Sequence, residues 1–228
     1  MNSIRQSITI ILLMCTWSMH AQVTTIEQFY LKYDGKNVSQ NFKTRPYLDE
    51  ITYPNATQRA LLLRNKKIVI NELETYNLIT KDSKNAYIKI EYTNAAIRIV
   101  YVYTSFKNKT GNQTFAISAT IEDAILVQKP CIYFCNYTKN SFSDCTAQVL
   151  SNLKLDHFFE PNEVNKGRMA AGKDVAYIIE LPQTGTAIKV QIWPTKEEQL
   201  TNFSRFKNLK VKPKTITMKW DKNNSKFM

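Results

Sequence analysis

The stretch that decides the fold of this chain runs from Ala86 to Tyr103 and has the sequence AYIKIEYTNAAIRIVYVY. Apolar residues recur at every second position in both of its halves, which is the period of a β-strand with one buried face. Folding the chain at residues 93–96 makes a hairpin with apolar cross-strand pairs. The pairs expected are Tyr92 with Ile97, Ile90 with Ile99, and Ile88 with Tyr101. Because Val100 and Val102 lie on the other face, we expect the second strand to be covered on both sides.

The same period predicts further strands. Val175–Leu181 and Thr186–Ile192 alternate on either side of the turn sequence Pro182–Gly185, which indicates a second hairpin. Other strands are expected at Phe115–Ile121, Ile125–Gln128, Leu209–Val211 and Ile216–Trp220.

Helices are predicted near both ends of the chain. Gln22–Tyr33 holds a short apolar stripe, and Asn55–Leu63 begins a second helix. The pattern allows this helix to continue toward Ile79, but that stretch is equally compatible with strand. Residues 195–198 form a capping box in front of a helix over residues 196–206. We therefore predict the α+β class, mainly antiparallel β-sheet, with helices in the N-terminal third and near residues 196–206. No linker or repeat divides the chain, so residues 22–228 are expected to form a single globular domain.

Residues 1–21 have the layout of a cleavable secretory signal peptide. Arg5 supplies a positive charge, and residues 8–17 are an apolar run of about ten residues, too short to span a membrane as a helix. Cleavage after Ala21 fits best, although Met19 stands where a small residue is usual. We expect an exported protein, periplasmic or extracellular.

Two alternatives concern the mode of export. A lipid anchor on Cys15 is possible in principle but disfavoured, because Met14 is larger than the residue that usually precedes an acylated cysteine. Asn-x-Ser/Thr sequons would allow a glycosylated eukaryotic protein; we favour a bacterial periplasmic protein. The sequons begin at Asn37, Asn55, Asn108, Asn112, Asn136, Asn202 and Asn223.

Three cysteines remain after cleavage, so at least one thiol of an exported chain is left over. Cys131 and Cys135 lie about 13 Å apart if they share one strand, too far for a disulfide. If residues 136–144 form the end of a hairpin centred on Asn140, Cys135 and Cys145 face each other. We therefore predict a Cys135–Cys145 disulfide, with Cys131 free.

The chain is basic, with 31 Lys and Arg against 19 Asp and Glu and a formal net charge of +12. Such a surplus favours an anionic partner or is simply a solvated face that keeps the protein soluble. The partner we expect is another protein with an acidic surface; an anionic polymer or a membrane surface is the alternative, and nucleic acid is not expected outside the cytoplasm. The candidate binding residues are Lys166, Arg168, Lys173, Lys210, Lys212 and Lys219.

One segment has most of the spacing of a phosphate-binding P-loop. Gly167–Asp174 lacks the final Ser or Thr that would bind magnesium. A P-loop also follows a buried strand and opens a helix, whereas residues 160–166 are polar and residues 174–181 have the pattern of a strand. We interpret the segment as a mobile basic loop and expect no nucleotide.

No catalytic set can be recognised in the mature chain. His157 is its one histidine, which excludes a metal site built from several histidines. Pro161 prevents a regular helix that would align His157 with Glu160 and Glu163. We expect no cofactor and no metal. The predicted function is a non-enzymatic binding protein of the periplasm or cell envelope, for example an immunity or inhibitor protein; the alternative is an exported hydrolase acting on a cell-wall or extracellular polymer.

Overall fold

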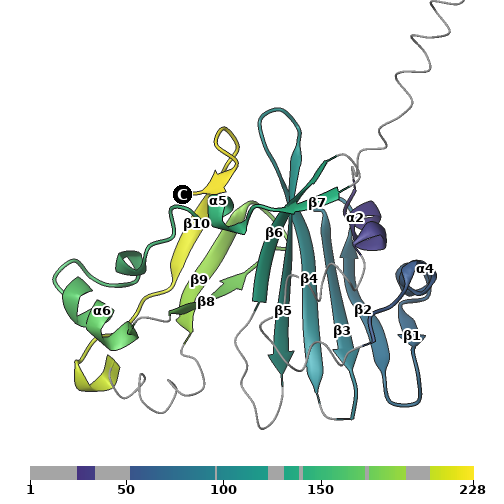
Figure 1. Ribbon diagram of the computed structural model, residues 1–228, viewed down its shortest axis with the longest axis horizontal. Helices are drawn as coiled ribbons and strands as arrows, with labels where there is room; N and C mark the ends of the chain where they lie inside the picture. The colour runs from purple at the N-terminus through teal and green to yellow at the C-terminus, as the bar shows by residue number, and fades with distance from the viewer. Residues whose placement is uncertain are drawn as a thin grey trace, which may run out of the picture.

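Two antiparallel sheets form the framework of the protein (Figure 1). The computed structural model describes residues 25–33, 52–95, 97–122, 131–138, 141–172, 175–193 and 206–228. The seven-stranded sheet follows the chain order and comprises β1 (Lys67–Val69), β2 (Thr75–Asp82), β3 (Tyr87–Thr93), β4 (Arg98–Lys107), β5 (Gln113–Glu122), β6 (Cys131–Thr138) and β7 (Ser141–Asp144). The four-stranded sheet comprises, in spatial order, β11 (Lys226–Phe227), β10 (Ile216–Asp221), β9 (Ala187–Trp193) and β8 (Ala176–Glu180). The α+β class predicted from the sequence is confirmed.

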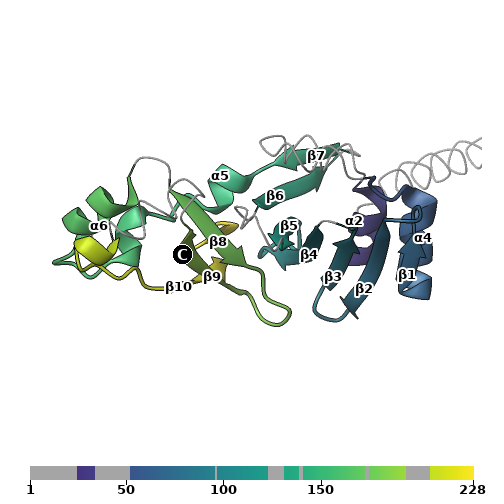
Figure 2. The same cartoon turned by 90° about the horizontal axis from the view of Figure 1, so that it is seen from below.

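One face of the seven-stranded sheet is covered by α2 (Ile26–Lys32) and α4 (Ala56–Asn65). Both helices begin with a capping box, in which the N-cap side chains of Thr25 and Asn55 accept hydrogen bonds from backbone amides three residues later. The sheet curls around α2 (Figure 2). Phe29 of this helix stacks on Phe115 of β5 at 4.2 Å between ring centroids and also meets Phe142 of β7. The contacts fix α2 inside the curve of the sheet.

The opposite face of β4, β5 and β6 packs against the four-stranded sheet. Phe106, Phe134 and Ala116 from the large sheet are buried with Phe227 and Trp220 from the small one. As expected from its two apolar faces, β4 is covered on both sides, with Tyr101 in the first core and Phe106 in the second.

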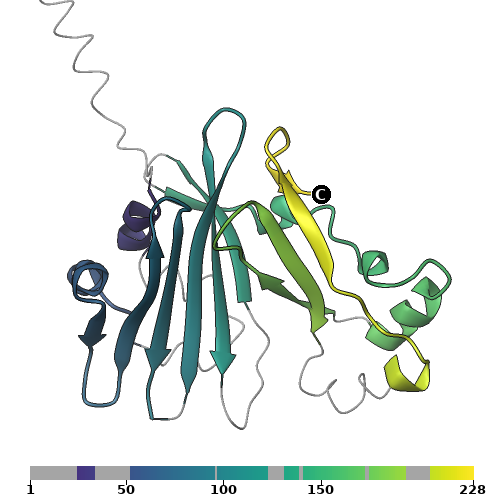
Figure 3. The ribbon, with the colours of Figure 1, turned by 180° about the vertical axis from the view of Figure 1, so that it is seen from behind.

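The chain that connects β7 to β8 contains α5 (Thr146–Val149), the 3-10 helix η1 (Leu155–Phe158) and α6 (Val164–Ala171). Helix α5 packs against β6, whereas η1 and α6 form a lobe of short helices beyond β10 in Figure 3. The segment 206–214 lies against this lobe, because Phe206 stacks on Phe159 and the Lys214 amide donates to the Phe158 carbonyl at 2.9 Å. Among the described helices, none is long and apolar enough to cross a membrane.

Several predicted elements need correction. The helix that begins at Asn55 ends at Asn65 and does not continue toward Ile79, because β1 and β2 occupy that stretch. Residues 209–211 form a turn and an extended link and not a strand. The predicted strand at 125–128 lies outside the described residues, as does the predicted helix at 196–206 apart from Phe206.

The β3–β4 hairpin exists, but its register differs by two residues from the prediction. Tyr92 pairs with Ile99, Ile90 with Tyr101 and Ile88 with Tyr103. A shift of two residues keeps every side chain on its own face, since side chains alternate with a period of two. The predicted buried face is therefore the observed one.

Candidate functional site

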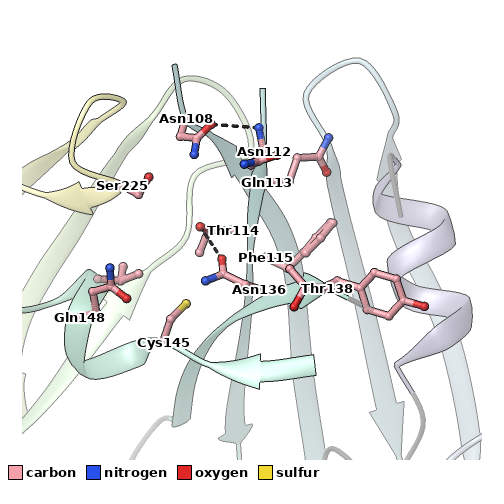
Figure 4. A pocket seen from close by; sticks show the side chains of 12 residues that line it. Asn108, Asn112, Gln113, Thr114, Phe115, Asn136, Thr138, Cys145, Gln148 and Ser225 are labelled. Carbon is pink, nitrogen blue, oxygen red and sulfur yellow. Dashed lines mark hydrogen bonds between the residues drawn. The ribbon is translucent and has the colours of Figure 1, made fainter. Parts of the chain in front are cut away.

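A cavity of about 280 Å³ opens where the two sheets meet, at the end of the molecule that carries the C-terminus (Figures 1 and 4). Its walls come from the β4–β5 turn, from β5, β6 and α5, and from the β10–β11 turn. The lining side chains are mainly amides and hydroxyls: Asn108, Asn112, Gln113, Thr114, Asn136, Thr138, Gln148 and Ser225, with Phe115, Tyr137, Cys145 and Val149. We call this the amide pocket.

Local sequence shapes the β4–β5 turn at the mouth of the amide pocket. The Oδ1 atom of Asn108 accepts hydrogen bonds from the backbone amides of Thr110 and Asn112, at 3.0 and 2.9 Å, and from the Thr110 hydroxyl. Gly111 adopts φ +86°, a backbone conformation that residues other than glycine rarely adopt. The Asn108 side chain accepts hydrogen bonds from amides of its own turn, and Gly111 adopts the left-handed conformation that the turn requires. Together they fix the shape of the turn at the mouth of the pocket.

Contacts between the two sheets hold the pocket open. The backbone amide of Lys109 donates to the Lys222 carbonyl at 2.9 Å, and Trp220 Nε1 donates to the Lys107 carbonyl at 2.9 Å. These bonds join the β4–β5 turn to the β10–β11 hairpin. The mouth therefore depends on residues more than a hundred positions apart in the chain.

The interior of the pocket is polar and neutral. Thr114 Oγ1 donates to Asn136 Oδ1 at 3.0 Å across β5 and β6 (Figure 4). Its described lining contains no carboxylate and no histidine. Amide and hydroxyl groups both donate and accept hydrogen bonds, so the pocket suits a ligand that carries both kinds of group.

Four lysines belong to the two turns that contribute to the walls of the amide pocket, or to the strand ends next to them. Lys107 and Lys109 flank Asn108 in the sequence, while Lys222 and Lys226 belong to the β10–β11 hairpin. We call these four residues the pocket lysines. Two acids lie nearby: Asp221 accepts the backbone amide of Asn223 in its own turn, and Asp144 accepts the backbone amide of Thr146. The surroundings are therefore net positive.

The predicted Cys135–Cys145 disulfide is absent, because Cys135 and Cys145 are not bonded to each other and both keep their thiols. The β6–β7 hairpin turns one position earlier than predicted, so that Cys135 lies opposite Asp144. A shift of one residue moves a side chain to the other face of the sheet. Cys135 is buried in the core under α2, whereas Cys145 belongs to the core between the sheets and lines the amide pocket.

Burial keeps both of these thiols protonated. It raises the pKa of Cys145 to about 12, helped by the nearby negative charge of Asp144, and raises that of Cys135 well above its usual value. Because the thiolate is the nucleophilic form, the raised pKa makes Cys145 a poor nucleophile at neutral pH.

Gly167–Ala171, the part of the P-loop-like segment that precedes Gly172, is helical and does not form the mobile loop that was predicted. Lys166 and Arg168 lie on α6, and Gly172 ends the helix with φ +73°. A Cβ atom on Gly167 would lie 2.5 Å from the ring of Phe159. Gly167 is therefore required by its close packing on the Phe159 ring, and Gly172 by the positive φ at which α6 ends.

The predicted basic residues fall into two separate places. Lys166, Lys210 and Lys212 are exposed on the helical lobe and the adjoining segment 206–214. Lys219 is exposed on β10, where its backbone amide donates to the Met228 carbonyl. Lys173 lies outside the described residues. The candidates that the structure describes therefore lie on different elements, with Lys166 and Arg168 on α6, Lys210 and Lys212 on the segment 206–214, and Lys219 on β10.

Arg168 is engaged in an ion pair with Asp156 of η1, since its Nε donates to Asp156 Oδ1 at 2.6 Å and Nη2 contacts the second carboxylate oxygen. The pairing holds the pKa of the Asp156 carboxyl below its ordinary value. His157 is exposed beside this pair. No group of three or more His, Cys, Asp or Glu residues that could bind a metal occurs in the part of the chain that the structure describes.

Three asparagines of the amide pocket share a feature that is visible in the sequence. Asn108, Asn112 and Asn136 lie at or close to the ends of strands, and each begins an Asn-x-Ser/Thr sequon. They cluster because β4, β5 and β6 run antiparallel, which brings the β4–β5 turn and the end of β6 to the same edge of the sheet.

Comparison with known proteins assigns no family to the chain. It matches no protein-family model and no curated protein. Among solved structures it is similar to a domain of an uncharacterized protein from Porphyromonas gingivalis W83, with a TM-score of 0.46 and 11% sequence identity. That similarity covers 84% of this chain and 96% of the Porphyromonas domain.

Proposed function

We propose that this chain is an exported, non-enzymatic binding protein of the bacterial periplasm or cell envelope, of the immunity or inhibitor type, which binds an acidic segment of another protein at the amide pocket. The observation that carries the proposal is a neutral cavity of about 280 Å³ whose two flanking turns carry lysines. The export signal over residues 1–21 and the net charge of +12 support the same proposal.

The chemistry of the pocket suits an acidic peptide. Side-chain amides such as Gln148 and Asn112 can bond the donors and acceptors of a peptide backbone, while the pocket lysines attract its carboxylates. Groups for catalysis are not gathered there: the described lining has no carboxylate or histidine, and the Cys145 thiol is protonated. The pocket therefore lends no support to the alternative of a hydrolase.

The test measures binding of an acidic polypeptide to the mature protein, residues 22–228. Poly-L-glutamate serves as the polypeptide and polygalacturonate as the anionic polysaccharide, each at 50 and 300 mM NaCl, by biolayer interferometry. We expect poly-L-glutamate to bind at low salt and to weaken at high salt, because exposed charges are screened. The double variant Lys109→Glu/Lys222→Glu should weaken this binding about tenfold or more.

A matched charge reversal on the helical lobe, Lys166→Glu/Lys212→Glu, is the control and should bind like the wild type. A second pair of variants adds one negative charge each. Gln148→Glu adds it to the lining of the pocket with little change in side-chain shape, whereas Asn162→Asp adds it on an exposed turn outside that lining. The proposal fails if the lobe variant loses binding and the pocket variant does not. If polygalacturonate binds and poly-L-glutamate does not, the proposal of an acidic protein partner is wrong and the ligand is an anionic polysaccharide.

A further inference from the structure

A second, much smaller cavity lies in the core under the helices. Its walls are Tyr30 of α2, Tyr53 before α4, Arg59 of α4, and Tyr76, Tyr101 and Tyr103 of the sheet. The volume is about 20 Å³, which is room for one particle of about the size of a water molecule. We call it the tyrosine cavity.

Arg59 is the unusual residue in this cavity, because its side chain is charged and only 5% exposed. Nη1 donates to the Pro54 carbonyl at 2.6 Å and Nη2 donates to the Leu31 carbonyl at 2.7 Å. The guanidinium thus joins the C-terminal end of α2 to the start of α4. Its Nε–H is buried and has no hydrogen-bond partner among the described residues.

The positive charge of Arg59 lacks a counter-charge within the described part of the chain. The acceptors it contacts are neutral carbonyls, and the described lining of the cavity contains no acid. Glu74 is the buried acid of this region, but its carboxylate accepts hydrogen bonds from Tyr92, Asn71 and the backbone amide of Thr52. A buried cation without a compensating charge is strongly disfavoured.

The other polar groups around the cavity are neutral phenols. Burial raises the pKa of Tyr30 and of Tyr103, and the charge of Arg59 offsets only part of that rise. Both hydroxyls therefore stay protonated at any physiological pH and can donate hydrogen bonds. A buried cation together with neutral O–H donors is suited to an anion and unsuited to a cation.

We propose that the tyrosine cavity binds one small inorganic anion of the size of chloride, held by the Nε–H of Arg59 and by tyrosine hydroxyls. The volume excludes a larger group such as a carboxylate on a carbon chain. The bound anion neutralises Arg59 and so strengthens the contact between α2, α4 and the sheet. Since it binds only the folded chain, chloride raises the stability of the fold.

The first test compares sodium chloride with sodium gluconate at equal ionic strength, using thermal unfolding of the mature protein. Gluconate is too large for the cavity, so it controls for screening. We expect the Tm to rise with chloride in a saturable way, by about 2–4 °C at saturation for a chain of this length. The variant Arg59→Met should lose this dependence, while Arg64→Met, an exposed arginine on the same helix, should keep it.

A second measurement uses the wild type alone, so that it does not depend on the folding of a variant. Crystals grown in sodium bromide should show an anomalous bromide peak within hydrogen-bond distance of Arg59 Nε. Equal Tm values in chloride and gluconate overturn the proposal, as does a cavity without bromide, which would then hold water. A bromide peak without chloride-dependent stability means an adventitious ion only, and also overturns it.

Discussion

The cores on the two faces of the seven-stranded sheet contain aromatic side chains in different proportions. The core under α2 and α4 holds Phe29 and Phe115 but is richer in tyrosines: Tyr30, Tyr33, Tyr76, Tyr92, Tyr101, Tyr103 and Tyr133. The face toward the four-stranded sheet buries Phe106, Phe134, Phe158, Phe159, Phe206, Phe227 and Trp220. We call them the tyrosine core and the phenylalanine core.

The different aromatic content of the two cores determines which of them can contain buried charged side chains. Arg59 and Glu74 are the buried charged residues of the described chain, and both adjoin the tyrosine core. Phenol hydroxyls supply hydrogen bonds that a phenylalanine ring cannot, so only the tyrosine core can accommodate ionised groups. Its stability should therefore depend on pH and on ions, whereas that of the phenylalanine core should depend on packing alone.

The largest effect is expected from Phe227→Ala. The ring of Phe227 is fully buried and lies 5.1 to 5.8 Å, between centroids, from those of Phe106, Trp220 and Phe134. Its removal should lower the free energy of unfolding by about 3–5 kcal/mol in urea titrations. The loss should be the same at pH 7 and pH 4, since no ionised group adjoins the ring. Met228→Ala, at an exposed neighbour, is the control, and a loss below about 1 kcal/mol would mean that the two sheets pack only loosely.

A smaller, pH-dependent effect is expected from Tyr92→Phe. The Tyr92 hydroxyl donates to Glu74 Oε1 at 2.7 Å and accepts from Asn94. Its removal leaves a buried carboxylate with one partner fewer, which should cost about 1–3 kcal/mol at pH 7.

The sign of the pH dependence follows from the pKa of Glu74. Burial opposes ionisation, but hydrogen bonds from Tyr92, Thr52 and Asn71 outweigh it and lower the pKa below 4.5. A lowered pKa stabilises the fold above the unfolded value, and this stability is lost as the pH falls through the folded value. In urea titrations from pH 7 to pH 3, Tyr92→Phe should lose less stability than the wild type below about pH 4.5. Tyr103→Phe keeps the bonds to Glu74 and should retain the wild-type slope; equal slopes in all three proteins would remove the role of Tyr92.

The smallest effect is expected from reduction. Cys135 belongs to the tyrosine core and Cys145 to the phenylalanine core, so the sheet itself separates the two thiols. A reductant should leave the free energy of unfolding unchanged within about 0.5 kcal/mol, whereas loss of a disulfide would cost about 2–4 kcal/mol. Mass spectrometry after alkylation of unfolded, unreduced residues 22–228 should find both Cys135 and Cys145 labelled. Two protected cysteines would show that the register of the β6–β7 hairpin is different.

The two hairpins explain how far prediction from the sequence could go. For β3–β4 the predicted register was wrong by two residues, and the buried face was nevertheless correct. For β6–β7 it was wrong by one residue, and the predicted disulfide was lost with it. The alternation of Ile88, Ile90 and Tyr92 identifies a face, but the exact partner of each residue depends on the turn.

Neither the amide pocket as a whole nor the tyrosine cavity could be assembled from the sequence, although three asparagines of the amide pocket stand out there as sequons. Asn108 and Ser225 line the same pocket only because two sheets meet there. Likewise, nothing in the local pattern of Asn55–Leu63 shows that Arg59 is buried, since its acceptors on Leu31 and Pro54 are provided by the packing of α2 on α4.

The sequence by itself determined the α+β class, the strands from β3 to β5, the presence of α2 and α4, and which side chains of β3 and β4 are buried. These features depend on the period of apolar residues and on local hydrogen bonds, which are properties of neighbouring residues. Only the tertiary structure decided the register of the hairpins, the free state of Cys135 and Cys145 and the two cavities. These depend on contacts between distant segments, whose free energy is set by how whole faces pack together.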